Sequence, residues 1–375
     1  MYKRDLLPVI QERCFKGKAI LLLGARQVGK TTLLKMLMQE QGNKILYLNC
    51  DEPQTVMLLT NRNLRDLKAL IGSNTFVVID EAQKVDNIGL TIKLIVDNMP
   101  EIQVIATGSS AFELRNQLNE PLTGRKFEYQ LFPISTNEIL LSEGLLDVHR
   151  LFETRLIYGS YPDILTHTGD AHELLMSLAD SYLYKDILAT DHLRKPDTLD
   201  KLLRALAYQV GSEVSYNELA QTIGTDSKTV ERYIELLEKC FIIFRLHGLS
   251  RNIRNELKRS KKVYFYDNGI RNAVIQQFSP MEMRNDQGAL WENFFISERK
   301  KFNHYRHHYC NTYFWRTKTQ QEIDYIEECD GKMTAFEMKW NPKKGKTKIP
   351  DSFMKAYDVK EAVIITPENY FDWVH

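Results

Sequence analysis

The sequence is 375 residues long and 43% hydrophobic, so the chain is long enough to bury more than one core. Its formal net charge is +1, so the overall charge indicates no particular class of partner, and local charge clusters are considered separately. No apolar run approaches the roughly 18–20 residues that a membrane-spanning helix requires, and the N-terminus has no apolar core of signal-peptide length. Five scattered cysteines without a C-x-x-C pair favour free thiols in a reducing compartment. We therefore expect two or three domains and a cytoplasmic location.

Between residues 18 and 107, short apolar runs alternate with segments of helical length. Four of the runs are typical of buried strands in a parallel sheet, namely residues 19–23, 45–48, 76–79 and 104–106. Residues 30–40 and 88–97 have the length and composition of helices. This alternation predicts an α/β domain with a mostly parallel sheet, in which a ligand binds at the carboxyl ends of the strands.

A glycine-bounded loop follows the first predicted strand. Residues 24–31 match the G-x-x-x-x-G-K-[ST] pattern, in which glycines let the backbone wrap around phosphate oxygens at a helix N-terminus. Lys30 is expected to reach the β- and γ-phosphates, and the Thr31 hydroxyl to bind Mg²⁺. The loop therefore predicts a site for ATP and Mg²⁺, against the alternative of a chance glycine turn. The residues expected to contact the nucleotide are Gly24, Ala25, Arg26, Gln27, Val28, Gly29, Lys30, Thr31 and Thr32.

Two adjacent acids follow another predicted strand. Four apolar residues place Asp80 at the end of a buried strand, where its carboxylate is expected to complete the Mg²⁺ site. Glu81 is the candidate general base that polarises the attacking water. The alternative is an acidic strand end that caps the next helix. The predicted strand at 45–48 falls between the two motifs in the chain, as in P-loop ATPases of the additional-strand type.

Three further residues are candidates for roles in hydrolysis. Ser109 could position the water between Glu81 and the γ-phosphate, or cap a helix that begins at residue 111. Arg125 is the candidate arginine finger, in cis or in trans, and a surface salt bridge is the alternative. Arg26, within the loop, is the weaker choice for the same role.

The segments GARQVGKTT, FVVIDEAQ, TGSS, LTGRKFEYQLFPIS and YGSYPDIL occur in this order along the chain. Together they resemble a group of prokaryotic AAA-type ATPases whose C-terminal region has no known function, and the resemblance covers nearly the whole chain. It implies an AAA-like ATPase domain with a helical lid at residues 1–190. It further implies a winged-helix segment at 191–272 and a nuclease-like α/β domain, similar to restriction endonucleases, at 273–375.

The middle of the chain has the pattern of two helices joined by a short turn. Ser215 can cap a helix, with Glu218 at the capping-box position, and Gly224 ends it. A second helix can start at Asp226, and residues 240–246 are then expected to form a strand of the wing. The apolar stripe of this second helix comprises Val230, Tyr233, Ile234, Leu237 and Cys240.

This segment offers either a nucleic-acid contact or a protein-binding module. A basic stretch follows the predicted strand and could neutralise several phosphates, whereas a solvated charged wing would look the same. Acidic residues on the second helix, among them Glu231 and Glu235, weaken an electrostatic grip on phosphates. The basic residues are Arg251, Arg254, Lys258, Arg259, Lys261 and Lys262.

The C-terminal part contains a predicted β-hairpin. Residues 322–326 and 334–340 alternate like half-buried strands, and Asp330-Gly331 is a strong signal for a two-residue turn. With that turn at the centre, Cys329 pairs with Lys332. Counting outward places two carboxylates directly opposite each other on one face of the hairpin.

These carboxylates are Asp324 and Glu337, with Cβ atoms expected about 5 Å apart, and Lys339 shares their face. Together they suit a hard cation such as Mg²⁺ that activates water for phosphodiester cleavage. The arrangement resembles the PD-(D/E)xK nuclease superfamily, in which Glu292 matches the upstream helical acid, although the proline before the first aspartate is absent. The alternative is an inert scaffold in which Lys339 pairs with Glu322.

Two neighbouring patterns leave alternatives open. The basic, aromatic residues 299–318 could track a nucleic-acid strand by stacking and charge, or could belong to the core. His304, His307, His308 and Cys310 have the composition of a soft-metal site, but without a second cluster a structural role is favoured.

The sequence thus favours an ATP-hydrolysing motor or switch that controls a C-terminal module acting on DNA or another nucleic acid. In this hypothesis Glu292, Asp324, Glu337 and Lys339 cleave the nucleic acid. The competing hypothesis is a regulatory ATPase that docks a protein partner through an inactive nuclease-like scaffold. Neither the oligomeric state nor the source of the arginine finger follows from the sequence.

Overall fold

The computed structural model describes residues 1–39, 42, 44–109, 122–180, 196–249, 261–317, 319–341, 349–359 and 361–375. The chain forms two compact units, here called the N-terminal unit, chiefly Lys3–Pro133, and the C-terminal unit, chiefly Ile134–Glu238 with Ile242–His375. The units divide near residue 133, so the described helices that follow, up to Asp180, belong to the second compact unit. The domain boundaries at 190 and 272 stay predictions. In the described parts of the chain, no helix has the length and apolarity to cross a membrane.

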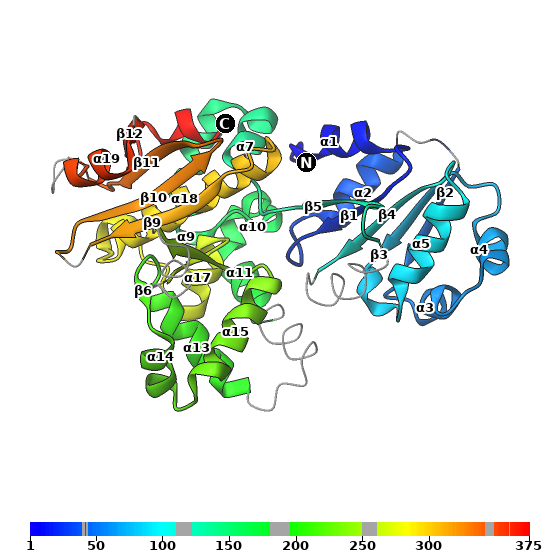
Figure 1. Cartoon of the computed structure of the whole chain (residues 1–375), viewed down its shortest axis with the longest axis horizontal. Helices are drawn as coiled ribbons and strands as arrows, with labels where there is room; N and C mark the ends of the chain where they lie inside the picture. The colour runs from blue at the N-terminus through cyan, green and yellow to red at the C-terminus, as the bar shows by residue number, and fades with distance from the viewer. Residues whose placement is uncertain are drawn as a thin grey trace. The chain divides into compact units, whose positions relative to one another are not determined.

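The N-terminal unit is built on a parallel sheet of five strands in the order β2-β3-β4-β1-β5 (Figure 1). The strands are β1 (Ala19–Leu23), β2 (Ile45–Asn49), β3 (Phe76–Asp80), β4 (Gln103–Gly108) and β5 (Lys126–Gln130). Every residue of β1, β3 and β4 is buried, which explains their continuous apolar sequences. The predicted parallel sheet is confirmed, and β4 lies between β1 and β3.

Helices cover this sheet and connect its strands. The expected helix after the loop is α2, and the expected helix at 88–97 is α5, which lies against the sheet (Figure 1). The helices are α1 (Leu6–Arg13), α2 (Lys30–Gln39), α3 (Pro53–Leu59), α4 (Leu64–Ile71) and α5 (Ile88–Asn98), with a 3-10 turn at Ala82–Lys84. The alternation of strands and helices brings the carboxyl ends of β1, β3 and β4 to one edge of the sheet.

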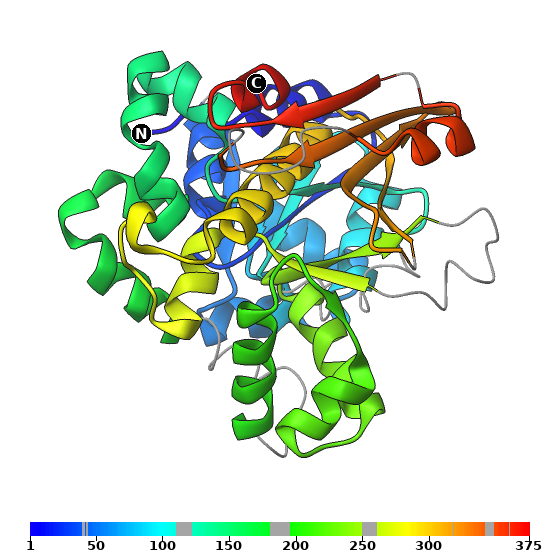
Figure 2. The same ribbon diagram turned by 90° about the vertical axis from the view of Figure 1, so that its left-hand side faces the viewer.

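The C-terminal unit contains a mixed sheet of seven strands in the order β12-β11-β10-β9-β7-β8-β6 (Figure 2). The strands are β6 (Glu213–Val214), β7 (Ile243–Gly248), β8 (Lys261–Phe265), β9 (Asn311–Arg316), β10 (Glu322–Cys329), β11 (Lys332–Met338) and β12 (Glu361–Ile365). Strands β10 and β11 form an antiparallel hairpin, and β7 joins β9 in parallel. Strands from the middle and from the end of the chain therefore share one sheet.

The long helix α18 (Gln287–Tyr305) lies against this sheet (Figure 2). Aromatic side chains contribute to this packing. Trp291 is fully buried and donates its indole N–H to the Ile365 carbonyl oxygen at 3.3 Å, and the Phe295 and Phe336 ring centroids are 5.9 Å apart. The remaining α-helices of this unit are α7 (Thr136–Glu143), α8 (Leu145–Arg150), α9 (Phe152–Tyr158), α10 (Pro162–Thr166), α11 (Ala171–Asp180), α13 (Pro196–Tyr208), α14 (Tyr216–Ile223), α15 (Ser227–Lys239), α17 (Asn268–Ile275) and α19 (Asp351–Tyr357). Short 3-10 turns lie at Thr168–Asp170, Met281–Met283 and Tyr370–Trp373.

The two helices predicted in the middle of the chain are present as α14 and α15. The Ser215 hydroxyl accepts the Glu218 N–H at 3.4 Å, and Gly224 ends α14 in the left-handed conformation. The strand predicted from residue 240 begins only at Ile243. The reason is a turn after α15, in which Phe241 has φ 59° and the Ile242 N–H bonds to the Leu237 carbonyl oxygen at 3.0 Å.

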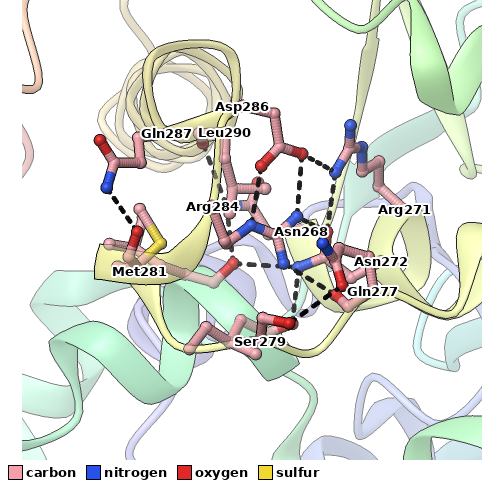
Figure 3. Close-up of polar contacts among 12 residues, drawn as sticks. Asn268, Arg271, Asn272, Gln277, Ser279, Met281, Arg284, Asp286, Gln287 and Leu290 are labelled. Carbon is pink, nitrogen blue, oxygen red and sulfur yellow. Dashed lines mark hydrogen bonds and ion pairs between the residues drawn. The ribbon is translucent and has the colours of Figure 1, made fainter.

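A buried polar network fixes the segment that leads into α18 (Figure 3). The Asp286 carboxylate accepts hydrogen bonds from Arg284 at 2.8 Å and from Arg271 of α17 at 2.6 Å. The Asn272 side-chain oxygen accepts from the same two guanidinium groups at 3.1 and 3.0 Å. Each charged group is thus paired within the network, which indicates a structural role.

Candidate functional site

The loop between β1 and α2 has a backbone conformation that restricts which residues fit at some of its positions. A Cβ atom on Gly24 would lie 2.3 Å from the Leu131 carbonyl oxygen, so only glycine fits there. Gln27 and Gly29 have φ values of 58° and 97°, in the left-handed region that tightens the turn. Ala25 and Val28 are buried beneath the loop, whereas Gln27 and Thr32 are exposed and Arg26 is half-buried.

Lys30 lies at the first position of α2 and folds back over the loop. Its ammonium group donates to the carbonyl oxygens of Gly24 and Ala25, each at 2.9 Å. The side chain is only 5% exposed, so its charge is held at the N-terminus of the helix, where the backbone N–H groups also attract anions. This geometry fits the triphosphate of a nucleotide.

The predicted metal ligands of the N-terminal unit face each other. The Thr31 hydroxyl donates to Asp80 Oδ2 at 3.1 Å, because the ends of β1 and β3 meet at the same edge of the sheet. Both side chains offer the oxygen ligands that Mg²⁺ prefers. The residues present therefore fit a magnesium ion.

Two further hydroxyl groups contact the same carboxylate, and sequence reasoning missed both. Tyr47 of β2 donates to Asp80 Oδ2 at 2.6 Å, and Thr107 of β4 donates to Asp80 Oδ1. Burial, followed by the hydrogen bond to Asp80, raises the pKa of Tyr47 above its usual range. The one signal in the sequence is position: both residues lie on the strands that flank β3, near their carboxyl ends.

The candidate base Glu81 is held by neighbouring side chains. Glu81 has φ 53°, which is uncommon for a residue other than glycine, and its N–H donates to Thr107 Oγ1 at 3.0 Å. Its Oε2 accepts from the Gln83 amide at 2.6 Å and from the Ser109 hydroxyl at 3.1 Å. Ser109 thus contacts Glu81, while the helix it was expected to cap lies outside the described residues.

The structure corrects the expectation that Arg125 acts as a finger in cis. Its carbonyl oxygen accepts the N–H of Ala19, at the amino end of β1, whereas the loop follows the carboxyl end of that strand. Its guanidinium pairs with Asp97 at 2.5 Å and is partly exposed. Arg125 therefore lies at the edge of the sheet opposite the nucleotide site, which leaves only the role in trans as a prediction.

The predicted hairpin register in the C-terminal unit is present. Cys329 pairs with Lys332, and Asp330 and Gly331 have φ values of 51° and 76°, as a two-residue turn with two left-handed residues requires. Tyr325 pairs with Phe336, so the next positions outward, Asp324 and Glu337, lie opposite each other.

The hairpin brings its two carboxylates and a lysine together. Lys339 Nζ donates to Glu337 Oε1 at 2.6 Å, and Asp324 Oδ2 accepts the Met338 N–H at 2.9 Å. Burial, and after it the Asp324 carboxylate, raises the pKa of Glu337 to about 7. The cluster is therefore crowded with negative charge.

Glu292 of α18 joins this cluster, together with a lysine that was expected elsewhere. Lys262 of β8, assigned from the sequence to a basic stretch for nucleic acid, is buried and contacts Glu292 at 3.2 Å and Glu322 at 2.6 Å. Tyr264 donates to Glu292 at 2.6 Å. Burial raises the pKa of Glu292 to about 7, although Lys262 opposes the shift. The partner expected for Glu322 was Lys339, and the structure supplies Lys262 instead.

Most aromatic side chains in the described part of residues 299–318 belong to the core, whereas Tyr309 is 87% exposed and stays a candidate for stacking. Tyr305, Phe314 and Trp315 are buried, and the Arg299 guanidinium is paired with the buried Glu327 at 2.6 Å. These side chains are therefore closed to bases. The basic residues 251–259 lie outside the described residues.

Two of the cysteines are paired, which corrects the expectation of five free thiols. A disulfide joins Cys310 to Cys329, whereas Cys14, Cys50 and Cys240 are buried and belong to no disulfide. Among the described residues, Cys310, Cys329 and Glu327 lie as close together as metal ligands do, but the two sulfurs are joined in the disulfide and offer no thiolate to a metal. The pairing of Cys310 agrees with the structural role favoured for this segment. Arg299 and Asn303 already donate hydrogen bonds to the Glu327 carboxylate, so a metal at this carboxylate would have to displace them.

Comparisons with known proteins divide the chain into three segments. Residues 16–140 match the family described as an AAA domain. Residues 149–281 and 287–373 match two families described as domains of unknown function, DUF8612 and DUF4143. The family assignment thus covers the N-terminal site and leaves the function of the C-terminal unit open.

Two curated relatives and one solved structure are similar to much of the chain. An uncharacterized protein of Mycobacterium tuberculosis is 25% identical over 345 residues, which cover 90% of this chain and 74% of that protein. An uncharacterized protein of Methanocaldococcus jannaschii is 25% identical over 301 residues, 69% of this chain and 63% of that protein. The solved structure of the Walker-type ATPase of Pyrococcus abyssi has a TM-score of 0.52 at 18% identity, covering 73% of this chain and 96% of that chain, and shows the fold. Residues 16–140 therefore match an AAA domain, and the chain shares the fold of a Walker-type ATPase.

Proposed function

We propose that the protein binds ATP with Mg²⁺ in the loop at residues 24–32 and hydrolyses the γ-phosphate. The observation that carries this proposal is the meeting of Thr31 and Asp80, 3.1 Å apart, beside the Lys30 ammonium group. Thr31 and Asp80 hold the metal, which when bound neutralises charge that develops on the phosphates. Lys30 stabilises the same charge through its position at the helix N-terminus.

In this proposal Glu81 is the general base. Its carboxylate takes a proton from the attacking water, and Ser109, which already contacts Glu81 at 3.1 Å, orients that water. The Gln83 amide donates to the same carboxylate at 2.6 Å and helps to hold it in place. The finger comes either from Arg26 of the loop or from Arg125 of a second copy of the chain.

Two variants test ATP hydrolysis. Lys30→Ala is expected to lose ATP binding in a calorimetric titration with Mg²⁺. Glu81→Gln is expected to keep binding but lose phosphate release, because the amide cannot accept a proton. Glu101→Gln, at an exposed position of the same unit, is the matched control and should resemble the wild type. Full turnover in Glu81→Gln would remove Glu81 as the base.

The nucleotide state is proposed to control the C-terminal unit. One version gives that unit a protein partner, with the carboxylate cluster as an inert scaffold. It is supported by the ion pairs that Lys262 and Lys339 make with carboxylates of the cluster. A divalent cation does not fit beside two ammonium groups in this conformation, because like charges in a buried cluster repel strongly.

The second version is nucleic-acid cleavage by the same cluster. It is supported by the convergence of Glu292, Asp324, Glu337 and Lys339, which come from a helix and a hairpin. A plasmid-nicking assay separates the versions. Metal-dependent nicking that Asp324→Ala and Lys339→Ala abolish, and Lys30→Ala keeps, would establish cleavage. The absence of cleavage, with salt-insensitive or no binding of DNA and RNA, would leave the docking version.

A further inference from the structure

A buried lysine from another strand of the same sheet contacts the carboxylate cluster. Lys262 lies on β8, and its side chain is 2% exposed. Its ammonium group is 2.6 Å from Glu322 of β10 and 3.2 Å from Glu292 of α18. Three elements that are far apart in the sequence therefore meet at one cation.

The neighbours of Lys262 close this side of the cluster. Tyr264, two residues along the same strand, donates to the Glu292 oxygen that Lys262 also contacts. A Cβ atom on Gly211, which precedes β6, would lie 3.2 Å from that oxygen, so the backbone of the turn covers the carboxylate. The Phe314 ring lies beside the ammonium group, with its centroid 5.4 Å from Nζ. Lys262 is thus held in place by packing as well as by charge.

The charges show why a cation belongs at this position. Four carboxylates, those of Glu292, Glu322, Asp324 and Glu337, lie within one cluster, and two lysines face them. Glu337 Oε2 is buried and has no hydrogen-bond partner among the described residues. Burial alone would discharge Lys262, yet the carboxylates, Glu292 foremost, raise its pKa above the ordinary value. Four acids in such an environment need positive charge between them.

We propose that Lys262 is the resident cation of this cluster. Its ammonium group lies between Glu292 and Glu322, close enough to Asp324 to interact with that carboxylate, and its charge excludes a divalent metal from the hairpin carboxylates while β8 remains in the sheet. Cleavage chemistry at the hairpin is therefore silent in this conformation. The proposal goes beyond ATP hydrolysis and stands independently of it.

The test is Mn²⁺ binding to the full chain without nucleotide, followed by electron paramagnetic resonance. Wild type and Asp324→Asn should bind Mn²⁺ equally weakly, because neither has an open site at the cluster. Lys262→Met keeps the aliphatic packing without the charge and should gain one Mn²⁺ per chain, at least about ten-fold tighter than wild type. Adding Asp324→Asn to that variant should abolish the gain. Lys261→Met, the neighbour on the same strand, is the matched control and should behave as wild type.

Two results would overturn the proposal. The first is Mn²⁺ binding by the wild type that Asp324→Asn removes, since the cluster would then be open beside Lys262. The second is a folded Lys262→Met protein that gains no site. If Lys262→Met does not fold, Lys262→Met with Glu322→Gln removes one acid of the cluster and should show the same gain. Because no nucleotide is present, neither result depends on ATP hydrolysis.

Discussion

The two units present carboxylates in similar settings but give them different partners. Asp80, at the end of β3, is contacted by the hydroxyl groups of Thr31, Tyr47 and Thr107, which are neutral donors that an incoming cation can displace. Glu292 and Glu337 are contacted by the ammonium groups of lysines. A carboxylate with hydroxyl partners is ready for a metal, and one with ammonium partners already has its counter-charge. The partners therefore decide what an acidic motif can do.

The largest effect on activity is expected at the nucleotide site of the N-terminal unit. Glu81→Gln should lower steady-state phosphate release by about 10²–10⁴-fold, the usual contribution of a general base, while ATP binding is retained. A coupled assay of phosphate release measures the rate, and calorimetry measures the binding. Equal loss of binding and turnover would mean that Glu81 shapes the site rather than acting on water.

A large loss of stability is expected in the C-terminal unit, where charges are buried as pairs. Glu298 of α18 is 1% exposed and pairs with Arg155 at 3.0 Å and Lys301 at 2.6 Å. Glu298→Gln should cost about 3–5 kcal/mol of unfolding free energy, because the two cations would lose their counter-charge. Chemical denaturation measures this loss. An unchanged midpoint would show that water or another acid compensates the cations.

The Glu298 carboxylate also makes the stability of the protein depend on pH. Burial opposes its charge, but Lys301 and Arg155 lower the pKa of Glu298 from 4.5 to about 2. A depressed pKa means that its stabilisation is complete above pH 4.5 and is lost as the pH falls towards 2. Wild type should therefore lose stability across this window, and Glu298→Gln should lose less. Parallel curves of stability against pH for wild type and Glu298→Gln would contradict this role of the Glu298 carboxylate.

The sequence predicted those features that depend on neighbours along the chain. The loop at residues 24–31, the strand ending at Asp80 and the hairpin turn at Asp330 each rest on residues close in sequence, and the structure has all three. Loop glycines, apolar runs and a two-residue turn specify their own geometry. Most of the N-terminal sheet follows from such local signals.

The contacts that were missed join distant segments. Lys262 lies 30 residues from Glu292, and Tyr47 lies 33 residues from Asp80. No local pattern predicts that β8 enters the same sheet as the hairpin, because it joins through β7 and β9. Lys262 and Lys261 look alike in the sequence, and only the fold buries one of them. The disulfide between Cys310 and Cys329 was missed for the same reason.

A smaller effect is expected from the hydroxyl partners of Asp80. Tyr47→Phe removes one neutral donor from that carboxylate, a change of about 0.5–1.5 kcal/mol. Because Mg²⁺ must displace such donors, the Mg²⁺ concentration for half-maximal ATP hydrolysis should fall several-fold. Thr60→Val, at a distant hydroxyl that bonds only within its own helix turn, is the matched control. A rise in the Mg²⁺ requirement would mean that Tyr47 orients Asp80 for the metal instead.

The smallest effect is expected at Asp324. Asp324→Asn removes one of the crowded charges of the cluster while its oxygen can still accept the Met338 N–H. Relief of like-charge repulsion across the hairpin should stabilise the protein by about 0.2–1 kcal/mol, measured as a higher denaturation midpoint. A clear loss of stability would show that the ionised form of Asp324 is required by its neighbours, Lys262 and Lys339.

The number of Mn²⁺ ions bound per chain at saturating ATP tests the contrast between the two carboxylate sites most directly. Hydroxyl partners at Asp80 and ammonium partners at the hairpin predict one ion, which Lys30→Ala and Asp80→Asn remove and Asp324→Asn leaves in place. No ion at all, or an ion that persists in Asp80→Asn and disappears in Asp324→Asn, would contradict it.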